Sequence, residues 1–274
     1  MRATGKLGGQ IAVVLGAAGR DNMGQVIARR FSEEGATVIV AGRHADELER
    51  LANELGGHAK TCDITDRHQV FELFAFASAI GGKVDIAVNA TGWGLLRPFL
   101  DTSVEELQQM SALQFIGPFL FCQAAIEAMA SGGSIIQISS ATATILFEDH
   151  AAYMGTKAGT DHVIRCVANE FGHKGIRANS ISPGMTDTPM TAAAKQVPGL
   201  FEAFVSGYPL GRIGTPDDIA AAAVWLASSE CFMTGQNLQV NGGLTLRRNP
   251  SKSEIEASVS AAASLNPAAQ GQQS

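Results

Sequence analysis

The chain contains short runs of apolar residues that alternate with longer stretches whose apolar residues recur at helical spacing. The runs lack the apolar and polar alternation of a half-exposed strand, which is typical of parallel strands covered on both faces. The stretches between them are long enough for helices, as in residues 23–35, where Val26, Ile27 and Phe31 share one face. The pattern predicts seven strands, at residues 11–15, 37–41, 58–62, 84–88, 134–138, 176–181 and 237–240.

The order of these elements predicts the fold class. Further helices are expected at residues 44–55, 66–80 and 104–129, from near Tyr153 to near Gly172, and at 217–228. A repeated strand and helix order predicts an α/β, doubly wound (Rossmann) domain with one seven-stranded parallel sheet. A ligand of such a sheet binds across the carboxyl ends of the strands at the switch point, here between the first and fourth strands. Trp225 is expected on the core face of the last helix.

Composition divides the chain into two unequal parts. With 274 residues, of which 46% are hydrophobic and 17% charged, the chain is long enough to bury the core of one such domain. From residue 249 onward the sequence turns to Ser, Ala, Gln and Asn, with few large apolar residues. We expect a dinucleotide-binding and catalytic domain at residues 1–248. Residues 249–274 are expected to form a low-complexity, disordered tail that is dispensable for folding, with a frayed helix at 253–263 left open.

Charge and cysteine usage argue against several classes of function. The net charge of −6 comes without a cluster of Lys and Arg, so a nucleic-acid surface is not expected. The four cysteines are far apart and form no C-x-x-C pair, which favours buried, reduced thiols in a cytoplasmic protein. No apolar run is long enough to cross a bilayer, and the scattered histidines predict no metal site. Arg2 and Lys6 before residues 11–18 imitate a short signal peptide, but the glycine turn and helix that follow favour a first strand.

A glycine-rich turn follows the first predicted strand. Gly16 opens this turn and Gly24 lies at the start of the next helix. A strand, a glycine turn and a helix in this order present free backbone N–H groups and the positive helix end to a pyrophosphate. Glycine matters in the turn because a Cβ would keep the phosphate away from the backbone. Arg20 lies inside the turn, where it could reach a phosphate or be solvated. The turn predicts a dinucleotide site.

The candidate chemistry lies in a segment that carries a phenol and an ammonium at helical spacing. Tyr153 and Lys157 are four residues apart (157 − 153), so their side chains share one helix face. A protonated lysine beside a phenol favours the phenolate, which predicts a Tyr153 pKa below the ordinary value of about 10. The pair therefore predicts a general acid/base. Ser140 follows a predicted strand and lies thirteen residues before Tyr153 (153 − 140).

A serine at a strand end followed by Y-x-x-x-K at this spacing resembles the short-chain dehydrogenase/reductase family, and the resemblance covers about residues 7–246. The resemblance implies that Ser140 hydrogen-bonds the substrate oxygen and that Tyr153 gives or takes its proton. It also implies that Lys157 holds the nicotinamide ribose. Gln114 stands where the family carries an active-site asparagine, and it keeps the amide with one more methylene. Gln114 is therefore a candidate member of a proton relay to Lys157.

The same resemblance assigns residues to the adenosine half of the cofactor. Asp63 and Ile64 match the family's adenine contact, although Asp63 could instead cap the helix at residues 66–80. Asn89 opens the segment Asn89-Ala90-Thr91-Gly92, a variant of the family's N-N-A-G that supports the sheet and lines the adenine-ribose side.

The nicotinamide half is matched by a segment after the sixth predicted strand. Pro183 and Gly184 open a P-G-x-x-x-T motif, which the resemblance implies bends over the nicotinamide. Thr188 is placed to contact the carboxamide or the diphosphate. The alanine-rich residues 186–209, with prolines near both ends, are expected to form a mobile lid that sets the substrate range.

Two departures from the family pattern lie at the cofactor site. Gly16 and Gly24 are eight residues apart (24 − 16). In the family's T-G-x-x-x-G-x-G the first and last glycines are six residues apart. The second strand ends at Gly42-Arg43 instead of the acidic residue that binds both ribose hydroxyls of NAD. A guanidinium matches the 2′-phosphate of NADP, so Arg43 predicts NADP(H) over NAD(H). The alternative is a surface arginine that opens the next helix.

These features predict an oxidoreductase that transfers a hydride between NADP(H) and a ketone or aldehyde, or a secondary alcohol, with Tyr153 as general acid/base. Trp93 and Leu95 are candidates for the wall that meets this small-molecule substrate, with surface packing as the alternative. The resemblance also implies a homo-oligomer, a tetramer or a dimer. Two rivals stay open: a 3-oxoacyl thioester reductase of the same family, and a non-catalytic dinucleotide-binding sensor or scaffold, which Gln114 and the long glycine turn would suit.

Overall fold

A single parallel sheet forms the centre of the molecule. The structure, a computed structural model, describes residues 5–130 and 132–265. The strands lie in the order β3-β2-β1-β4-β5-β6-β7, and every neighbouring pair is parallel. This confirms the predicted seven-stranded doubly wound sheet, with strand ends that differ from prediction by at most two residues. The strands are β1 (Ile11–Leu15), β2 (Thr37–Gly42), β3 (His58–Thr61), β4 (Ile86–Asn89), β5 (Gly133–Ile138), β6 (Ile176–Pro183) and β7 (Asn237–Val240).

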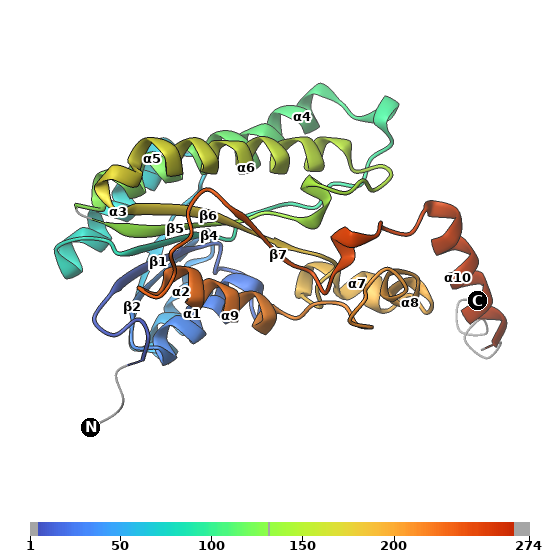
Figure 1. The fold of residues 1–274 in the computed structure, drawn as a ribbon, viewed down its shortest axis with the longest axis horizontal. Helices are drawn as coiled ribbons and strands as arrows, with labels where there is room; N and C mark the ends of the chain where they lie inside the picture. Colours follow the sequence, from blue (N-terminus) through green and yellow to red (C-terminus); the bar gives the residue numbers. More distant parts are fainter. Residues whose placement is uncertain (1–4, 131, 266–274) are drawn as a thin grey trace.

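Helices cover both faces of the sheet (Figure 1). One face is covered by α3 (Arg67–Gly81), α5 (Gly117–Ala128) and α6 (Ala151–Phe171), and the other by α1 (Met23–Glu33), α2 (Ala45–Leu55) and α9 (Pro216–Ala227). Each face has its own apolar cluster, because the strands direct alternate side chains to opposite sides. This explains the uninterrupted apolar runs of the sequence, because the side chains on both faces of each strand are buried under helices.

The ends of these helices are fixed by local sequence. The Asn22 side chain accepts a hydrogen bond from the backbone N–H of Gln25 and caps α1. Thr215 forms a capping box at the start of α9, which begins with a proline. Gly56 ends α2 in the left-handed conformation that a glycine adopts without strain. These short-range signals set where each helix begins and ends on the sheet.

The helical region expected at residues 104–129 is interrupted. It consists of α4 (Val104–Ser111), a π-helical turn at Ala112–Ile116, and α5. The cause is Pro118, which has no N–H to donate to the carbonyl of Gln114 four residues earlier. The hydroxyl of Thr160 in α6 donates to that carbonyl instead. π-Helical turns are frequent at functional sites, and this one carries a predicted site residue.

Two predictions about side-chain burial are wrong. Trp225 is 38% exposed, because Ile219, Ala223 and Leu226 occupy the core face of α9 and the indole lies beside that stripe. Cys166 is exposed on α6, while the other three cysteines are buried as expected.

The region beyond the carboxyl ends of the strands is built from short helices. The predicted lid contains α7 (Ala192–Lys195) and α8 (Leu200–Val205). In place of the disordered tail expected from residue 249, the structure has α10 (Lys252–Leu265), a longer helix than the frayed one left open, and it packs against α8 (Figure 1). Residues 266–274 of the expected tail lie outside the described residues.

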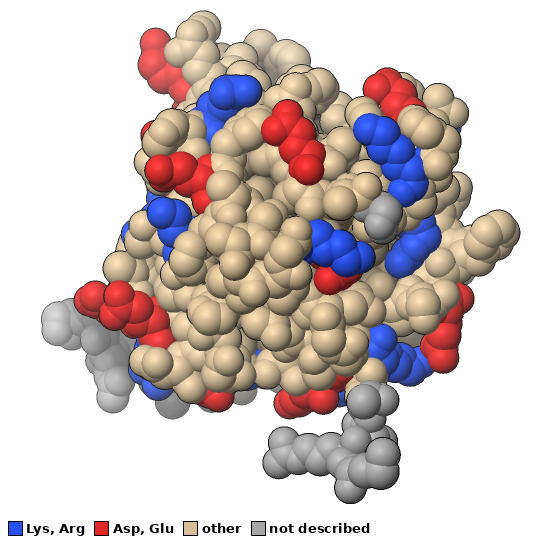
Figure 2. Space-filling view, turned by 90° about the vertical axis from the view of Figure 1, so that its left-hand side faces the viewer, with Lys and Arg blue, Asp and Glu red and all other residues tan. Residues whose placement is uncertain are grey.

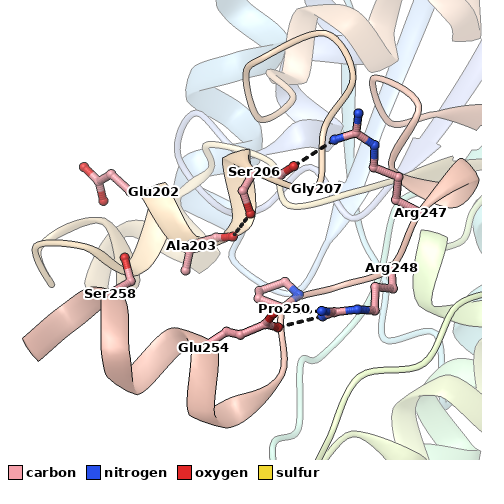
Figure 3. Close-up of a pocket in the computed structure, with 9 residues that line it drawn as sticks. All are labelled: Glu202, Ala203, Ser206, Gly207, Arg247, Arg248, Pro250, Glu254 and Ser258. Atoms are coloured by element: carbon pink, nitrogen blue, oxygen red, sulfur yellow. Dashed lines mark hydrogen bonds and ion pairs between the residues drawn. The ribbon is translucent and has the colours of Figure 1, made fainter. Parts of the chain in front are cut away.

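Polar contacts and one apolar side chain hold α10 in place. The hydroxyl of Ser258 donates to the carbonyl of Gly199 over 2.7 Å, and Ile255 packs against a small apolar cluster that includes Phe204 of α8. Arg248 forms a two-pronged ion pair with Glu254 in the first turn of α10, with N···O distances of 2.6 and 2.7 Å (Figure 3). The composition of residues 249–274 did not indicate a packed helix, because small Ala and Ser residues form no apolar stripe.

A cavity of about 480 Å³ lies between α8 and α10 (Figure 3). Its walls carry polar and charged side chains, among them Glu202 and Arg247, and the Arg247 guanidinium donates to the carbonyl of Ser206 over 3.0 Å. None of the predicted catalytic or cofactor residues lines this cavity. The predicted catalytic and cofactor residues therefore lie elsewhere in the molecule.

Candidate active site

The three predicted catalytic residues meet where β5 ends. Ser140 follows β5, while Tyr153 and Lys157 lie in the first two turns of α6. Ser140 lies beside the Tyr153 phenol and acts to lower its pKa, and the Nζ of Lys157 lies 5.6 Å from the centroid of the Tyr153 ring. The Ser140 hydroxyl itself is 2.8 Å from the hydroxyl of Thr142. Since β5 lies between β4 and β6, the group sits at the middle of the sheet. The structure brings the three side chains together, and their catalytic roles stay a prediction.

The electrostatics of Tyr153 differ from the sequence-based expectation. Burial raises the pKa of Tyr153 above its ordinary value, and the Ser140 side chain opposes this effect only in part. Lys157 contributes no lowering of the Tyr153 pKa, and burial lowers the pKa of Lys157 itself to about 8. The Lys157 ammonium donates to the carbonyl of Ile138 over 2.9 Å rather than to the phenol. In this structure the phenol therefore keeps its proton at neutral pH.

A buried carboxylate that the sequence analysis missed lies one helical turn beyond Lys157. Asp161 accepts hydrogen bonds from the hydroxyl of Ser139 over 2.8 Å and from the amide of Asn237 over 2.6 Å. Burial raises the pKa of Asp161, while the negative charge of Asp161 favours the protonated form of Lys157. The signal was the repeated spacing of four residues from Tyr153 to Lys157 to Asp161, which puts all three on one helix face.

Gln114 belongs to the π-helical turn, and its side chain lies beside Lys157 of α6. Its side chain is 2% exposed, its Oε1 accepts the backbone N–H of Trp93 over 3.2 Å, and its Nε2 donates to the hydroxyl of Thr156 over 3.2 Å. A Cβ added at Gly92 would lie 3.2 Å from the Gln114 Oε1 and 3.6 Å from the Lys157 Nζ. The amide and the ammonium thus border the same small space, and the relay role of Gln114 stays a prediction.

The glycine turn after β1 is closely packed. Gly16 has φ +101°, and a Cβ there would lie 2.7 Å from the carbonyl carbon of Ala90. A Cβ at Gly24 would lie 2.6 Å from the oxygen of Gly16. The two additional residues are held inside the turn, because the Asn22 amide donates to the Gly16 carbonyl and the buried Gln25 amide donates to the Ala17 carbonyl. The turn, called the glycine cradle below, accepts only glycine at both ends, because the protein's own backbone fills the space that a Cβ would take.

Both predicted basic residues of the cofactor site are exposed. Arg20 lies in the turn near Glu47, whose pKa is lowered chiefly by a hydrogen bond from Arg50 and to a smaller degree by the charge of Arg20. Arg43 follows β2 directly, and in the described part of the chain it forms no ion pair. The end of β2 presses against the glycine turn, since a Cβ at Gly42 would lie 2.6 Å from the Cβ of Ala18. Arg43 is therefore next to the turn.

The residues assigned to the adenosine side lie at the ends of β3 and β4. The carboxylate of Asp63 accepts hydrogen bonds from the backbone N–H and the hydroxyl of Thr65. The alternative role of Asp63 as a helix cap is wrong, because Asp66 caps α3. Ile64 is buried. The amide of Asn89 donates to the side-chain oxygen of Gln137 in the neighbouring strand over 2.9 Å, which ties β4 to β5.

The predicted nicotinamide segment is held by a tyrosine that the sequence analysis missed. Pro183 ends β6, and a Cβ at Gly184 would lie 2.3 Å from the phenol oxygen of Tyr208. That oxygen accepts the backbone N–H of Met185, and burial raises the pKa of Tyr208 to about 12. Thr188 starts a short turn at the base of the lid. Nothing in the local sequence around Tyr208 indicates this long-range contact.

The lid lies over the segment that follows β4. A Cβ at Gly94 would lie 3.8 Å from the sulfur of Met190, so the start of the lid meets this segment. Leu95 is buried and Trp93 is half-buried. Gly94, which lies between these two predicted wall residues in the chain, is thus the point where the segment meets the lid.

Other kinds of site receive no support from the side-chain arrangement. Residues 5–130 and 132–265 contain no group of three His, Cys, Asp or Glu side chains that could hold a metal ion, and no helix long and apolar enough to cross a membrane. Figure 2 views the side of the molecule opposite the lid and α10, and on that face acidic and basic side chains are interspersed.

Comparisons with known proteins agree with this architecture. Residues 16–245 match the family model described as Enoyl-(Acyl carrier protein) reductase. The chain is 35% identical over 250 residues to D-threitol dehydrogenase of Mycolicibacterium smegmatis, covering 88% of this chain and 95% of the relative. It is 36% identical over 250 residues to 3beta-hydroxysteroid dehydrogenase 1 of Eggerthella lenta, again covering 88% and 95%. A solved short-chain type dehydrogenase/reductase from Mycobacterium ulcerans has a TM-score of 0.86 at 28% identity and covers 95% of both chains.

The chain therefore belongs to the short-chain dehydrogenase/reductase family, as its serine, tyrosine and lysine spacing suggested. It is an NAD(P)-dependent oxidoreductase that acts on CH–OH and C=O groups.

Proposed function

We propose that the chain transfers a hydride between NADP(H) and a ketone or aldehyde, or in reverse a secondary alcohol, with Tyr153 as general acid/base. The observation that carries this proposal is the Tyr153 side chain, half-buried near the end of β5, beside Ser140 and one helical turn from Lys157. The raised pKa of Tyr153 supports a protonated phenol at neutral pH, which is the general-acid form needed for carbonyl reduction.

Each side chain has one task in this proposal. When bound, the cofactor supplies or accepts the hydride. The Tyr153 hydroxyl gives its proton to the substrate oxygen, or takes it in the oxidation direction, and Ser140 donates a hydrogen bond to the same oxygen. Lys157 binds the nicotinamide ribose and favours the phenolate when the ammonium is turned toward Tyr153. Gln114 borders Lys157 and would hold the water through which a proton reaches solvent.

The cofactor would lie across the carboxyl ends of β1 and β4. The glycine cradle joins the end of β1 to the N-terminal end of α1, and a helix N-terminus after a glycine turn favours a diphosphate. Side chains on both sides of this cradle complete the proposed site: Gly16, Arg20, Gly24, Arg43, Asp63, Ile64, Asn89 and Lys157, with Pro183, Gly184 and Thr188 on the nicotinamide side.

Selection of NADP(H) over NAD(H) is part of the proposal. Arg43 is exposed next to the glycine turn and has no acidic partner in the part of the chain that is described. Its guanidinium is free to receive the 2′-phosphate, and no carboxylate at the end of β2 repels that phosphate.

A 3-oxoacyl thioester is the second candidate substrate class. The observation that favours it is the matching family model, whose description names an acyl carrier protein reductase. The relatives named for threitol and for a hydroxysteroid favour a free alcohol instead. A panel of substrates separates these classes.

We also propose a homo-oligomer, a tetramer or a dimer, in the cytoplasm. Phe115, Ile116 and Phe119 are exposed on the outer side of α5 and its preceding turn, and Trp225 is exposed on α9. The three apolar side chains on α5 and its preceding turn form one exposed group, which supports contact between subunits, and Trp225 lies on the opposite face of the sheet. The cysteines form no disulfide among the described residues, which supports a reducing compartment. A monomer measured by light scattering at micromolar concentration would contradict the first statement.

The proposed function is tested by following reduced cofactor over a panel of ketones, aldehydes, polyols, a 3-hydroxysteroid and a 3-oxoacyl thioester. The expected result is turnover of a free carbonyl or alcohol, faster with NADP(H) than with NAD(H). Fastest turnover of the thioester would favour the second candidate. Tight cofactor binding without turnover of any member of the panel would instead support the sensor or scaffold.

A further inference from the structure

His150 lies directly against the ring of the proposed general acid. Its imidazole stacks on the Tyr153 phenol, with ring centroids 4.2 Å apart and planes 24° from parallel. His150 immediately precedes α6, but its side chain makes no capping hydrogen bond there. The ring is half-buried. A polar ring is thus placed beside the reacting group, and neither helix capping nor exposure to solvent accounts for it.

One nitrogen of this ring is fixed by the backbone. The Nδ1 of His150 lies 2.7 Å from the carbonyl oxygen of Leu95. Because a carbonyl oxygen only accepts, Nδ1 must carry the hydrogen. Burial lowers the pKa of His150, which favours the neutral ring. In the neutral ring the second nitrogen, Nε2, then carries a lone pair and is a hydrogen-bond acceptor.

The Nε2 is the free nitrogen of this ring as far as residues 5–130 and 132–265 are concerned. Among the described residues, no donor forms a hydrogen bond with it and no carboxylate forms an ion pair with it. The nearest acidic residue in sequence, Asp149, has its carboxylate 3.1 Å from the ammonium of Lys252. The acceptor beside Tyr153 is therefore available to a bound molecule.

Apolar contacts on the other side hold the ring in place. The edge of Phe147 meets His150, with ring centroids 6.0 Å apart, and Phe147 also packs against Phe204 of the lid helix α8 at 5.6 Å. The imidazole thus lies between the lid cluster and Tyr153. Its carbonyl partner Leu95 belongs to the segment beneath the lid, which is the predicted substrate wall.

We propose that the Nε2 of His150 accepts a hydrogen bond from a second hydroxyl of the substrate, on the carbon next to the reacting one, so that the enzyme prefers vicinal diols and polyols over simple alcohols. This inference rests on the proposed function, in which Tyr153 meets the reacting oxygen. Hydroxyls on adjacent carbons point to neighbouring positions. A substrate whose reacting oxygen meets the phenol can therefore offer its other hydroxyl to the ring stacked on that phenol.

The expected size of the preference follows from the cost of an unpaired buried acceptor. A substrate without the second hydroxyl would displace water from Nε2 and leave it unsatisfied. Sites built to bond a substrate hydroxyl discriminate strongly against analogues that lack it, and for this half-buried acceptor we expect about tenfold or more.

The test compares matched alcohols in matched variants. The ratio of kcat/KM is measured for 2,3-butanediol against 2-butanol, and for cyclohexane-1,2-diol against cyclohexanol. His150→Gln carries an amide oxygen to the place of Nε2, whereas His150→Asn keeps an amide donor for the Leu95 carbonyl and loses the outer acceptor. His150→Phe keeps only the stacking. Because the readout is a ratio, a general loss of activity or of folded protein does not imitate the effect.

We expect a ratio of about ten or more in the unaltered protein and in His150→Gln, falling toward about one in His150→Asn and His150→Phe. A ratio near one in the unaltered protein, or a high ratio that survives in both His150→Asn and His150→Phe, would overturn the inference while leaving the proposed function intact. Failure of the unaltered protein to oxidise any alcohol or reduce any carbonyl of the wider panel would overturn both.

Discussion

The sheet and the region beyond its carboxyl ends are stabilised in different ways. The sheet is enclosed by two large clusters of buried side chains, one on each face, and the glycine cradle and Lys157 are anchored in this part. The outer region has one small cluster, formed by Ala141, Phe204, Tyr208 and Leu244. Its helices α7, α8 and α10 are otherwise held by polar contacts such as that of Ser258 with Gly199. Cofactor binding thus relies on a densely packed framework, and substrate binding on a lightly packed one.

The two regions meet at Tyr153, the proposed general acid/base. Ile255 of α10 and Phe204 of α8 pack in the small cluster, Phe147 packs against Phe204, and His150 follows Phe147 and stacks on Tyr153. Changes in the outer region are therefore expected to reach the substrate side of Tyr153 without disturbing the cofactor cradle. Each prediction below tests this division.

The largest effect is expected from Tyr153→Phe, which removes the transferable proton and keeps the ring. Turnover should fall by about 10²-fold or more, the usual scale for a lost general acid, while the affinity for NADPH changes by less than about threefold. Steady-state rates and cofactor fluorescence titration measure the two quantities. Lys157→Met is the comparison variant, because it should weaken both turnover and cofactor binding. A Tyr153→Phe protein as fast as its parent would remove Tyr153 from the mechanism.

The pH dependence should differ between the two directions. Carbonyl reduction needs the protonated phenol, and alcohol oxidation needs the phenolate. Because burial raises the pKa of Tyr153, the phenolate is the minor form at neutral pH. The kcat/KM for oxidation should then rise roughly tenfold per pH unit below that pKa, while that for reduction stays level until the phenol ionises. An oxidation profile that is flat between about pH 6 and about pH 9 would contradict the raised pKa.

Removal of α10 should act on the substrate side alone. A protein that ends at Asn249 loses the contacts of Ser258 and Ile255 with the lid. We expect the KM for the alcohol to rise about tenfold and the NADPH affinity to stay within about twofold, since the cradle is not touched. A protein that ends at Leu265 keeps α10 and is the matched control. Equal KM values for the two shortened proteins would mean that the tail is dispensable, as its composition suggested.

The smallest effect is expected from Arg43→Ala. The parent should bind NADPH about tenfold more tightly than NADH, or about 1.4 kcal/mol, and the variant should lose most of this difference. Arg20→Ala is the control, because a residue at the shared diphosphate should affect both cofactors equally. Equal affinities of the parent for NADPH and NADH, measured by titration, would refute the assignment of Arg43.

Features that depend on the local sequence were predictable, whereas features that depend on tertiary contacts were not. The strands followed from uninterrupted apolar runs such as residues 11–15, and the meeting of Tyr153, Lys157 and Ser140 from spacing and family resemblance. The raised pKa of Tyr153 was missed, because spacing predicts a neighbouring charge but not the burial that outweighs it.

Long-range partners set the other limits. Tyr208 is separated by 23 residues from the Met185 backbone that it binds, and no periodic pattern connects them. α10 was taken for a disordered tail because its alanines and serines carry little apolar surface, while its anchors are single contacts such as that of Ile255. Pro118 did indicate a break in the helical region, but the π-helical turn also depends on Thr160 from a different helix.

The most direct measurement is to follow the hydride itself. Reduced NADP carrying deuterium at the reactive nicotinamide carbon would be mixed with the best carbonyl substrate of the panel, using the unaltered protein and Tyr153→Phe in parallel, and the product examined by NMR. Both hydrogens of the reactive nicotinamide carbon are replaced by deuterium, so that either face delivers the label. The account predicts deuterium on the carbinol carbon of the product from the unaltered protein, and at least about 10²-fold slower appearance of labelled product from the variant although it binds the cofactor. Product without deuterium, or labelled product formed at equal rates by both proteins, would contradict it.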